Sequence, residues 1–456
     1  MTKLIATSIM ALAGGVALAQ QIPLTLEQAV QQASDRYPAV KSSLEQVLAA
    51  EAQIRLVRTS YLPRADFIGQ VNRASHNNEF GMLLTQPVIS PISGPVQGTN
   101  SLGSVWGSAV GVQVAWEPFD FGLRRALLAE AQIALGRAGT EVAVTRLQVE
   151  AAAADAFLTI LAADESAVAA RAAVERARVL GGIVDALVKN ELKPGADASR
   201  AHVEIALAEN QLIEAEQAAE VARAGLAQLL GVDPHDLSVQ PGPLLQLPPE
   251  QPPTAFAPAN HPLALAQAAA IAEVKSKEKA LDRSYFPRFD LQGTSYARGT
   301  GISPDGTTGG AASGLGPNIQ NWGLGITVTF SAFDFSSLKA RKEIELHNEL
   351  READKYDQFI QDLNGQMGKA RATLAGAQRV ARNTPTEVEA ARAGAQQADA
   401  RYRSGLGNIV EVAEADRILA QAEVDDALAR LGVWRALLAV AAASGDLQQF
   451  LEQSRK

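Results

Sequence analysis

The feature that most constrains this 456-residue sequence is an internal duplication. Three segments of the first half recur in the second half in the same order: residues 61–67 as 285–291, 116–121 as 330–335, and 221–223 as 433–435. The offset between matching segments shrinks along the chain, as deletions in loops would produce. We therefore expect two copies of one structural unit.

Each copy is expected to contain a helix, two strands and a long helical hairpin. Pro63 and Pro287 mark the turns where a helix gives way to a strand, because proline is excluded from a helix interior. Alternation with a period of two follows each proline, most clearly where Trp322, Leu324 and Ile326 share one face. Strands are predicted at about 64–75, 105–119, 288–299 and 322–332.

Long proline-poor segments rich in alanine follow the strands. The chain holds 84 Ala, while aromatic residues make up only 5%. This composition favours long helices that pack closely rather than several globular cores. Helical hairpins are predicted at 121–230, with a turn at 193–195, and at 336–443, with a turn at 404–407. A helix of the predicted length would extend roughly 100 Å.

Several helix ends are predicted from short patterns. Thr25 and Gln28 form a capping box at the start of a first short helix. Thr384 and Pro385 suggest a cap followed by a first-turn proline, and hence a kink or local break. Asp197 is interpreted as an N-cap after the first hairpin turn.

The first nineteen residues resemble a signal peptide. Lys3 precedes an uncharged stretch, and a small residue on either side of Leu18 favours cleavage after Ala19. The alternative, a single membrane anchor, fits the short apolar run less well. Cleavage would change the net charge from −9 to −10 by removing Lys3. The remaining chain has no run of about 20 apolar residues, so a membrane could be crossed only by strands.

The predicted division of the chain is a signal peptide at 1–19, a first repeat at 20–230, a proline-rich linker at 231–259 and a second repeat at 260–456. Strands with one apolar and one polar face suit a transmembrane barrel. Open sheet edges are forbidden in a bilayer, and small barrels need about eight strands. Four strands per chain therefore predict a barrel shared among copies.

Other chemistry is sparse. Cys is absent, which excludes disulfides and thiolate metal sites, and the five His are scattered without ligand spacing. Asp197, Ser199 and His202 lie near one turn of a helix, where triad geometry is not expected. The glycine-rich run at 309–316 lacks the Lys-Ser/Thr of a phosphate loop. We expect no enzymatic activity, no cofactor, no metal and no nucleic-acid partner.

The order of these motifs resembles the outer membrane efflux protein (TolC-like) family. The resemblance rests on LTLEQA at 24–29 followed by Tyr37-Pro38, on the paired Tyr-x-Pro-Arg strand entries, and on the two helical turns. It implies a mainly α fold with a transmembrane β-barrel contribution, assembled as a homotrimer with a twelve-stranded barrel and a periplasmic α-helical barrel. It also implies a periplasmic adaptor protein, an inner-membrane pump and outer-membrane lipid as partners.

The resemblance further implies which residues form the periplasmic aperture. Tyr402, Glu411 and Glu414 match the family pattern, whereas Gly407 stands where the family has arginine. Arg401 and Arg403 are the candidate replacements. Two carboxylates at i, i+3 would form stacked rings in a trimer, or would merely complement a helix dipole. The hairpin-tip residues expected to contact an adaptor are Pro194, Gly195, Gly405, Leu406 and Gly407.

Three functions remain open from the sequence. The first is an outer-membrane export duct of a tripartite efflux system. The second is the duct of a type I protein secretion system, and the third is a trimeric stalk without transport. The sequence does not name the substrate, the pump or the adaptor.

Overall fold

The computed structural model describes residues 23–78, 96–98, 100–249, 256–331 and 333–455. The predicted signal peptide lies outside these residues. The chain divides into two compact units, one of residues 1–41, 145–258 and 363–456, and the other of residues 42–144 and 259–362. We call them the hairpin unit and the strand unit. Each unit combines segments from both sequence repeats, so the repeats do not fold as separate domains.

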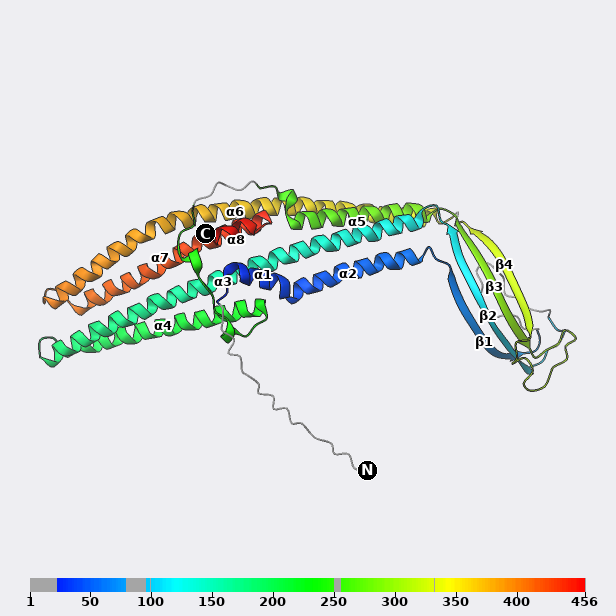
Figure 1. Ribbon diagram of the computed structural model, residues 1–456, viewed down its shortest axis with the longest axis horizontal. Coiled ribbons are helices and arrows are strands. Elements are labelled where there is room, and N and C mark those ends of the chain that lie inside the picture. Colours follow the sequence, from blue (N-terminus) through cyan, green and yellow to red (C-terminus); the bar gives the residue numbers. More distant parts are fainter. Residues whose placement is uncertain (1–22, 79–95, 99, 250–255, 332, 456) are drawn as a thin grey trace, which may run out of the picture. The chain divides into compact units, whose positions relative to one another are not determined.

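The strand unit contains one antiparallel sheet with the strand order β1-β2-β3-β4 (Figure 1). Its strands are β1 (Arg64–Ser75), β2 (Ser104–Phe119), β3 (Arg288–Thr300) and β4 (Ile319–Thr329). Continuous pairing joins β2 of the first repeat to β3 of the second, with a register shift between Trp116 and Phe119. The duplicated strand pairs therefore combine into a single sheet whose two outer strands are β1 and β4.

Helices adjoin each strand of this unit. The helix α2 (Pro38–Thr59), most of which belongs to this unit, precedes β1, and α5 (Pro262–Ser284) precedes β3. The helices α3 (Leu123–Lys189) and α6 (Phe335–Arg403) begin just after β2 and β4 and continue into the hairpin unit. Pro63 and Pro287 directly precede β1 and β3, at the positions expected for strand entry.

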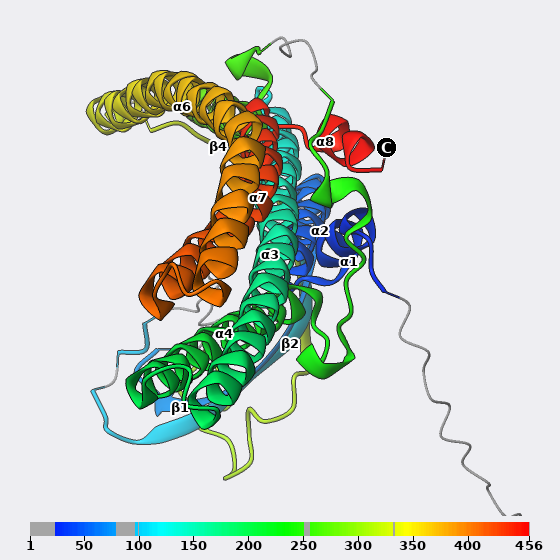
Figure 2. The same ribbon diagram turned by 90° about the vertical axis from the view of Figure 1, so that its left-hand side faces the viewer.

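The hairpin unit contains two helical hairpins, which Figure 2 views toward their turns. One joins α3 to α4 (Gly195–Leu230), and the other joins α6 to α7 (Ile409–Ser444). The short helices α1 (Leu26–Arg36) and α8 (Gln448–Gln453) complete the unit. Its main core contains Phe157, Leu226, Trp434 and Phe450 together with many alanines.

Between the repeats, residues 237–249 pack against the helices of the hairpin unit. The connecting segment contains the 3₁₀ turns η1 (Pro234–Asp236), η2 (Gly242–Leu245) and, after residues 250–255, η3 (Pro258–Asn260). Leu244 is buried, and the indole nitrogen of Trp434 donates a hydrogen bond to the Gln246 carbonyl oxygen at 2.9 Å. These contacts anchor residues 237–249 to the helices.

The patterns at helix ends have mixed outcomes. The capping box of Thr25 and Gln28 is confirmed. The predicted local break at Thr384-Pro385 is wrong, because α6 continues through Pro385, whereas the alternative of a kink stays a prediction. Thr384 is buried and its hydroxyl donates to an Asp426 carboxylate oxygen at 2.8 Å. This contact with α7 supports the helix where the proline lacks an N–H.

Among the described helices, α7 alone is long and apolar enough to pass a test for a membrane-spanning helix. Leu431, Trp434 and Leu438 of α7 are instead buried in the main core of the hairpin unit. We therefore interpret α7 as a core helix.

Candidate functional site: channel wall and hairpin ends

The two faces of the sheet differ in chemistry. Cross-strand partners such as Phe67 and Val112, or Ser295 and Trp322, lie on one face. We call this the apolar sheet face, and its large exposed residues include Phe67, Val71, Val110, Val112, Val114, Trp116, Trp322, Leu324, Ile326 and Val328. Trp322 is 80% exposed and Leu324 is 70% exposed. Such exposure of large apolar side chains is unfavourable in water and favourable in lipid.

The opposite face is polar. Asp66 pairs across the strands with Gln113, and Gln113 pairs with Thr294. Asn72, Gln292 and Arg298 follow the same alternation. A sheet with lipid on one side requires this pattern when the other side lines a water-filled interior.

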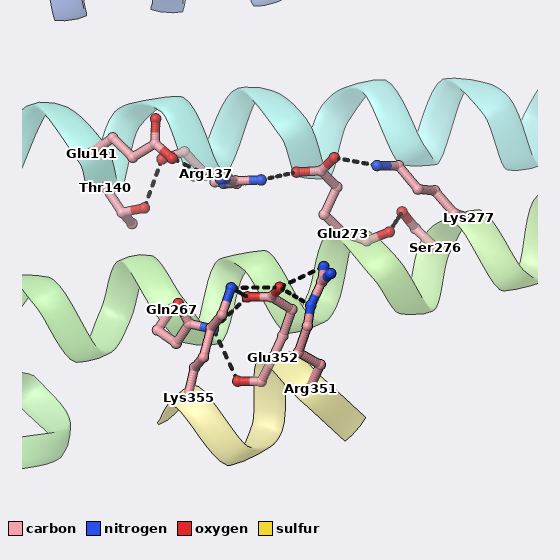
Figure 3. A network of polar contacts seen from close by, with 10 residues as sticks. All are labelled: Arg137, Thr140, Glu141, Gln267, Glu273, Ser276, Lys277, Arg351, Glu352 and Lys355. Carbon is pink, nitrogen blue, oxygen red and sulfur yellow. Dashed lines mark hydrogen bonds and ion pairs between the residues drawn. The ribbon is translucent and has the colours of Figure 1, made fainter. Parts of the chain in front are cut away.

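A polar network holds the helices of the strand unit together (Figure 3). Glu352 of α6 is buried and accepts hydrogen bonds from Gln267 Nε2 of α5 at 2.8 Å and from Lys355 Nζ at 3.1 Å. The pKa of Glu352 is lowered to about 2, and the hydrogen bond from Gln267 is the largest cause. Burial raises this pKa, but the hydrogen bonds from Lys355 and Arg351 lower it further. The carboxylate is therefore charged at neutral pH and fixes α6 against α5.

A second part of the network joins α3 to α5. Glu273 of α5 accepts hydrogen bonds from Lys277 Nζ at 2.7 Å and from Arg137 Nη1 of α3 at 2.9 Å. Burial raises the pKa of Glu273, but these hydrogen bonds outweigh it and the net shift is downward. Ion pairs therefore link the helix after β2 to the helix before β3.

Both hairpins end in short, exposed turns. In the first, α3 ends at Lys189 and α4 begins at Gly195, with Pro194 at the N-cap position. In the second, α6 ends at Arg403, and Asn408 caps α7 by accepting a hydrogen bond from the Glu411 amide. Gly405 adopts φ +74°, which favours glycine, and Leu406 is 73% exposed.

Asp197 has a different role from the one predicted. The N-cap interpretation is wrong, because Asp197 lies in the first turn of α4 after Pro194. Its carboxylate instead accepts a hydrogen bond from the Tyr402 hydroxyl of the other hairpin at 3.4 Å.

Tyr402 joins the two hairpin ends. It is 1% exposed and packs with Leu180, Val184, Ala201 and Ile409. The Lys193 ammonium lies 4.5 Å from its ring centroid. Burial, followed by the charge of Asp197 and the hydrogen bond to it, raises the pKa of Tyr402 above its usual value of 10. The phenol therefore remains a hydrogen-bond donor at neutral pH.

Each of the two predicted aperture carboxylates has an arginine partner. Glu411 Oε2 lies 3.7 Å from Arg401 Nε, and Glu414 Oε1 lies 2.6 Å from Arg417 Nη2. The hydrogen bond from Arg417 is the main reason that the pKa of Glu414 is lowered. Arg403 instead contacts Asp399, with 2.9 Å between Nε and Oδ1.

Gly407 leaves room for the Arg401–Glu411 pair. A Cβ atom at Gly407 would lie 3.2 Å from Glu411 Oε2 and 3.3 Å from Arg401 Cβ. The guanidinium of Arg401 also donates to the Leu406 carbonyl oxygen at 3.2 Å. Of the two candidate replacements for the missing arginine, Arg401 is therefore the one that contacts an aperture carboxylate.

Sequence reasoning missed a charged cluster farther along the hairpins. Glu423 contacts Arg176 at 3.1 Å and Arg392 at 3.5 Å, linking α3, α6 and α7. Burial raises the pKa of Asp416, Arg176 lowers it and Asp399 raises it, with a net upward shift. The residues of this cluster lie far apart in the sequence, so no local sequence pattern predicts it.

No group of three or more metal-ligating side chains occurs within the described part of the chain. The structure instead combines an apolar sheet face, a polar opposite face and paired helical hairpins. These features define the protomer of an outer-membrane channel.

The comparisons identify the family. The model of the outer membrane efflux protein family matches residues 29–232 and 257–446, so the chain belongs to that family. It is an outer-membrane efflux channel. No curated protein sequence matches the chain.

Solved structures agree in fold. The outer-membrane channel OprN is 20% identical, with a TM-score of 0.71 over 92% of this chain and 89% of that chain. The CmeC outer membrane channel of Campylobacter jejuni is 15% identical, with a TM-score of 0.73 over 94% and 89%. The open state of the Neisseria gonorrhoeae MtrE outer membrane channel is 18% identical, with a TM-score of 0.72 over 92% and 89%.

Proposed function

We propose that three copies of this chain form one twelve-stranded barrel in the outer membrane, continued by a helical tunnel in the periplasm. The observation that carries this proposal is the four-stranded sheet with its exposed apolar face. A bilayer offers no hydrogen-bond partners to the outer strands β1 and β4, so copies must pair edge to edge. Three copies supply twelve strands, above the minimum of about eight.

The finer proposal is that this duct serves a tripartite efflux system. A periplasmic adaptor would contact the hairpin tips at Pro194, Gly195, Gly405, Leu406 and Gly407. Leu406 supports this role, because it is a large apolar side chain exposed at a turn. An inner-membrane pump would then deliver substrates into the duct.

The aperture is proposed at the same hairpin ends. Tyr402, Glu411 and Glu414 would surround the opening, together with Arg403 at the end of α6. Threefold symmetry would bring three Glu411–Arg401 pairs and three Glu414–Arg417 pairs together. The proposal is that the carboxylates of these pairs, rather than their arginines, face the pore, so that carboxylate rings favour cations and allow divalent cations to block it.

The first experiment is reconstitution of the purified full chain in planar bilayers, with native mass spectrometry of the same sample. We expect trimers that conduct ions. Monomers would contradict the shared barrel, and trimers without ion current would contradict the duct and leave a structural stalk. Deletion of the gene then separates the export functions, since drug efflux predicts greater drug susceptibility and type I secretion predicts loss of a secreted protein.

The aperture is tested by the double variant Glu411→Ala/Glu414→Ala. We expect weaker cation selectivity and weaker block by divalent cations. The matched control is Glu387→Ala/Glu389→Ala, which removes the same charge from exposed positions of α6. Unchanged selectivity and block in the first variant would contradict the carboxylate rings but not the duct.

A further inference from the structure

A groove of about 1540 Å³ lies in the strand unit, on the helix side of the sheet. The first turns of α3, the last turns of α5 and the first turns of α6 form its walls. It is a mixed surface, with aromatic rings near the strands and basic side chains farther along the helices. None of the features used for the channel function explains this combination.

The aromatic end of the groove continues the apolar sheet face. Phe121 and Phe286 line the groove and stack with 5.2 Å between ring centroids. Phe121 also lies 6.1 Å from Phe289, which pairs across the sheet with Val328 of the apolar sheet face. Tyr285 also lines the groove, and its ring centroid lies 5.5 Å from that of Phe330, which directly follows β4. The groove therefore opens on the lipid side, where the membrane boundary meets the helices.

The helical end of the groove is basic. On α5, Lys275, Lys279 and Arg283 follow one another at intervals of four residues, which places them on one helix face. The other two helices add Arg125, Lys339 and Lys342. Six cations thus line the groove against three acids, Glu278, Asp282 and Glu343, in a chain whose net charge is −9.

Four of these six cations make no ion pair within the described residues. Lys342 contacts Asp282 at 2.6 Å and Lys275 contacts Glu349 at 3.4 Å. The other four, Arg125, Lys279, Arg283 and Lys339, are exposed and make none in the described part of the chain. Of these, the Arg283 guanidinium carbon lies 5.9 Å from the Phe286 ring centroid, which leaves Arg125, Lys279 and Lys339. Unpaired cations next to an aromatic, lipid-facing surface match the two parts of an anionic phospholipid, whose phosphate and acyl chains are covalently joined.

We propose that this groove binds an anionic phospholipid of the periplasmic leaflet of the outer membrane. Arg125, Lys279 and Lys339 contact the headgroup phosphate, while Phe121 and Phe286 contact the acyl chains. The proposal uses the outer-membrane position of the protein and does not depend on an adaptor or a pump. A neighbouring copy is a less suitable occupant, because copies join at the strand edges β1 and β4 and the groove continues the sheet's face.

The test is native mass spectrometry of the delipidated full chain, titrated with cardiolipin or with phosphatidylcholine of matched acyl chains. Each surface cation contributes about fivefold to anionic lipid binding, so Arg125→Gln/Lys279→Gln/Lys339→Gln should weaken cardiolipin binding on the order of 100-fold. Phosphatidylcholine binding should not change. Lys279→Arg/Lys339→Arg, which keeps the charge, should retain cardiolipin binding.

The matched control is Arg146→Gln/Lys189→Gln/Lys369→Gln, which removes three exposed cations of the hairpin unit. Equal weakening by both triple variants would overturn the proposal, as would equal binding of the two lipids by the unchanged protein. Cross-linking of Lys279 to a second copy would assign the groove to an interface instead. If the triple variant does not fold, Lys279→Gln alone should weaken cardiolipin binding about fivefold. Ion current through the reconstituted channel separately tests the duct.

Discussion

The Tyr402 hydroxyl is the clearest single point at which to perturb the hairpin ends. Tyr402→Phe removes one oxygen atom and keeps the ring that packs against Leu180 and Ile409. The lost interaction is the hydrogen bond to Asp197, which at 3.4 Å is long. A hydrogen bond to a charged group contributes about 1.5–3 kcal/mol, and because this one is long we assign it about 1 kcal/mol, the value of an ordinary hydrogen bond.

The expected effect follows from the number of copies. About 1 kcal/mol corresponds to roughly a fivefold change in the equilibrium between joined and separated hairpin ends. If the hairpin ends of all three copies separate together in the proposed trimer, the three fivefold changes multiply, and the equilibrium changes on the order of 100-fold. We therefore expect Tyr402→Phe to raise the open probability of the reconstituted channel by a factor between these values.

The assay is single-channel recording in planar bilayers, with Tyr356→Phe as the control. Tyr356 lies on the same helix in the strand unit, so its variant removes the same atom away from the hairpin ends. An open probability equal to that of the unchanged protein would refute the role of this hydrogen bond. An equal rise in both variants would show a general loosening of α6 instead.

Two further predictions concern stability and membrane insertion. Glu352 has a folded-state pKa of about 2, below its ordinary value of 4.5, so its contribution is complete above pH 4.5 and is lost as the pH falls toward 2. Glu352→Gln should lower unfolding stability at pH 7 by at most about 3 kcal/mol, and circular dichroism melts should show that this deficit shrinks in acid. A deficit that stays constant from pH 7 to pH 2 would contradict the charge network. Leu324→Lys places a charge on the apolar sheet face and should cost about 2–4 kcal/mol, which reduces the fraction of protein recovered in outer membranes. Thr327→Lys on the opposite face should insert normally, and equal recovery of the two variants would argue against the assignment of the faces.

The sequence by itself determined the repeated helices and strands. Helix exclusion by proline places the strand entries at Pro63 and Pro287, and alternation around Leu324 assigns the two sheet faces. These are local properties, because the period of a helix or strand and the restrictions of proline act within a few residues. The capping box at Thr25 belongs to the same class.

Only the tertiary structure decided what depends on distant partners. Pro385 lies inside a continuous helix, because Thr384 contacts Asp426 on another helix and long-range packing outweighs the local preference. Asp197 contacts Tyr402, which is 205 residues away, and Arg401 rather than Arg403 contacts Glu411. The basic groove likewise assembles from three helices of both repeats. The physical reason is that local sequence sets backbone conformation, whereas ion pairs and buried hydrogen bonds form only after packing brings distant helices together.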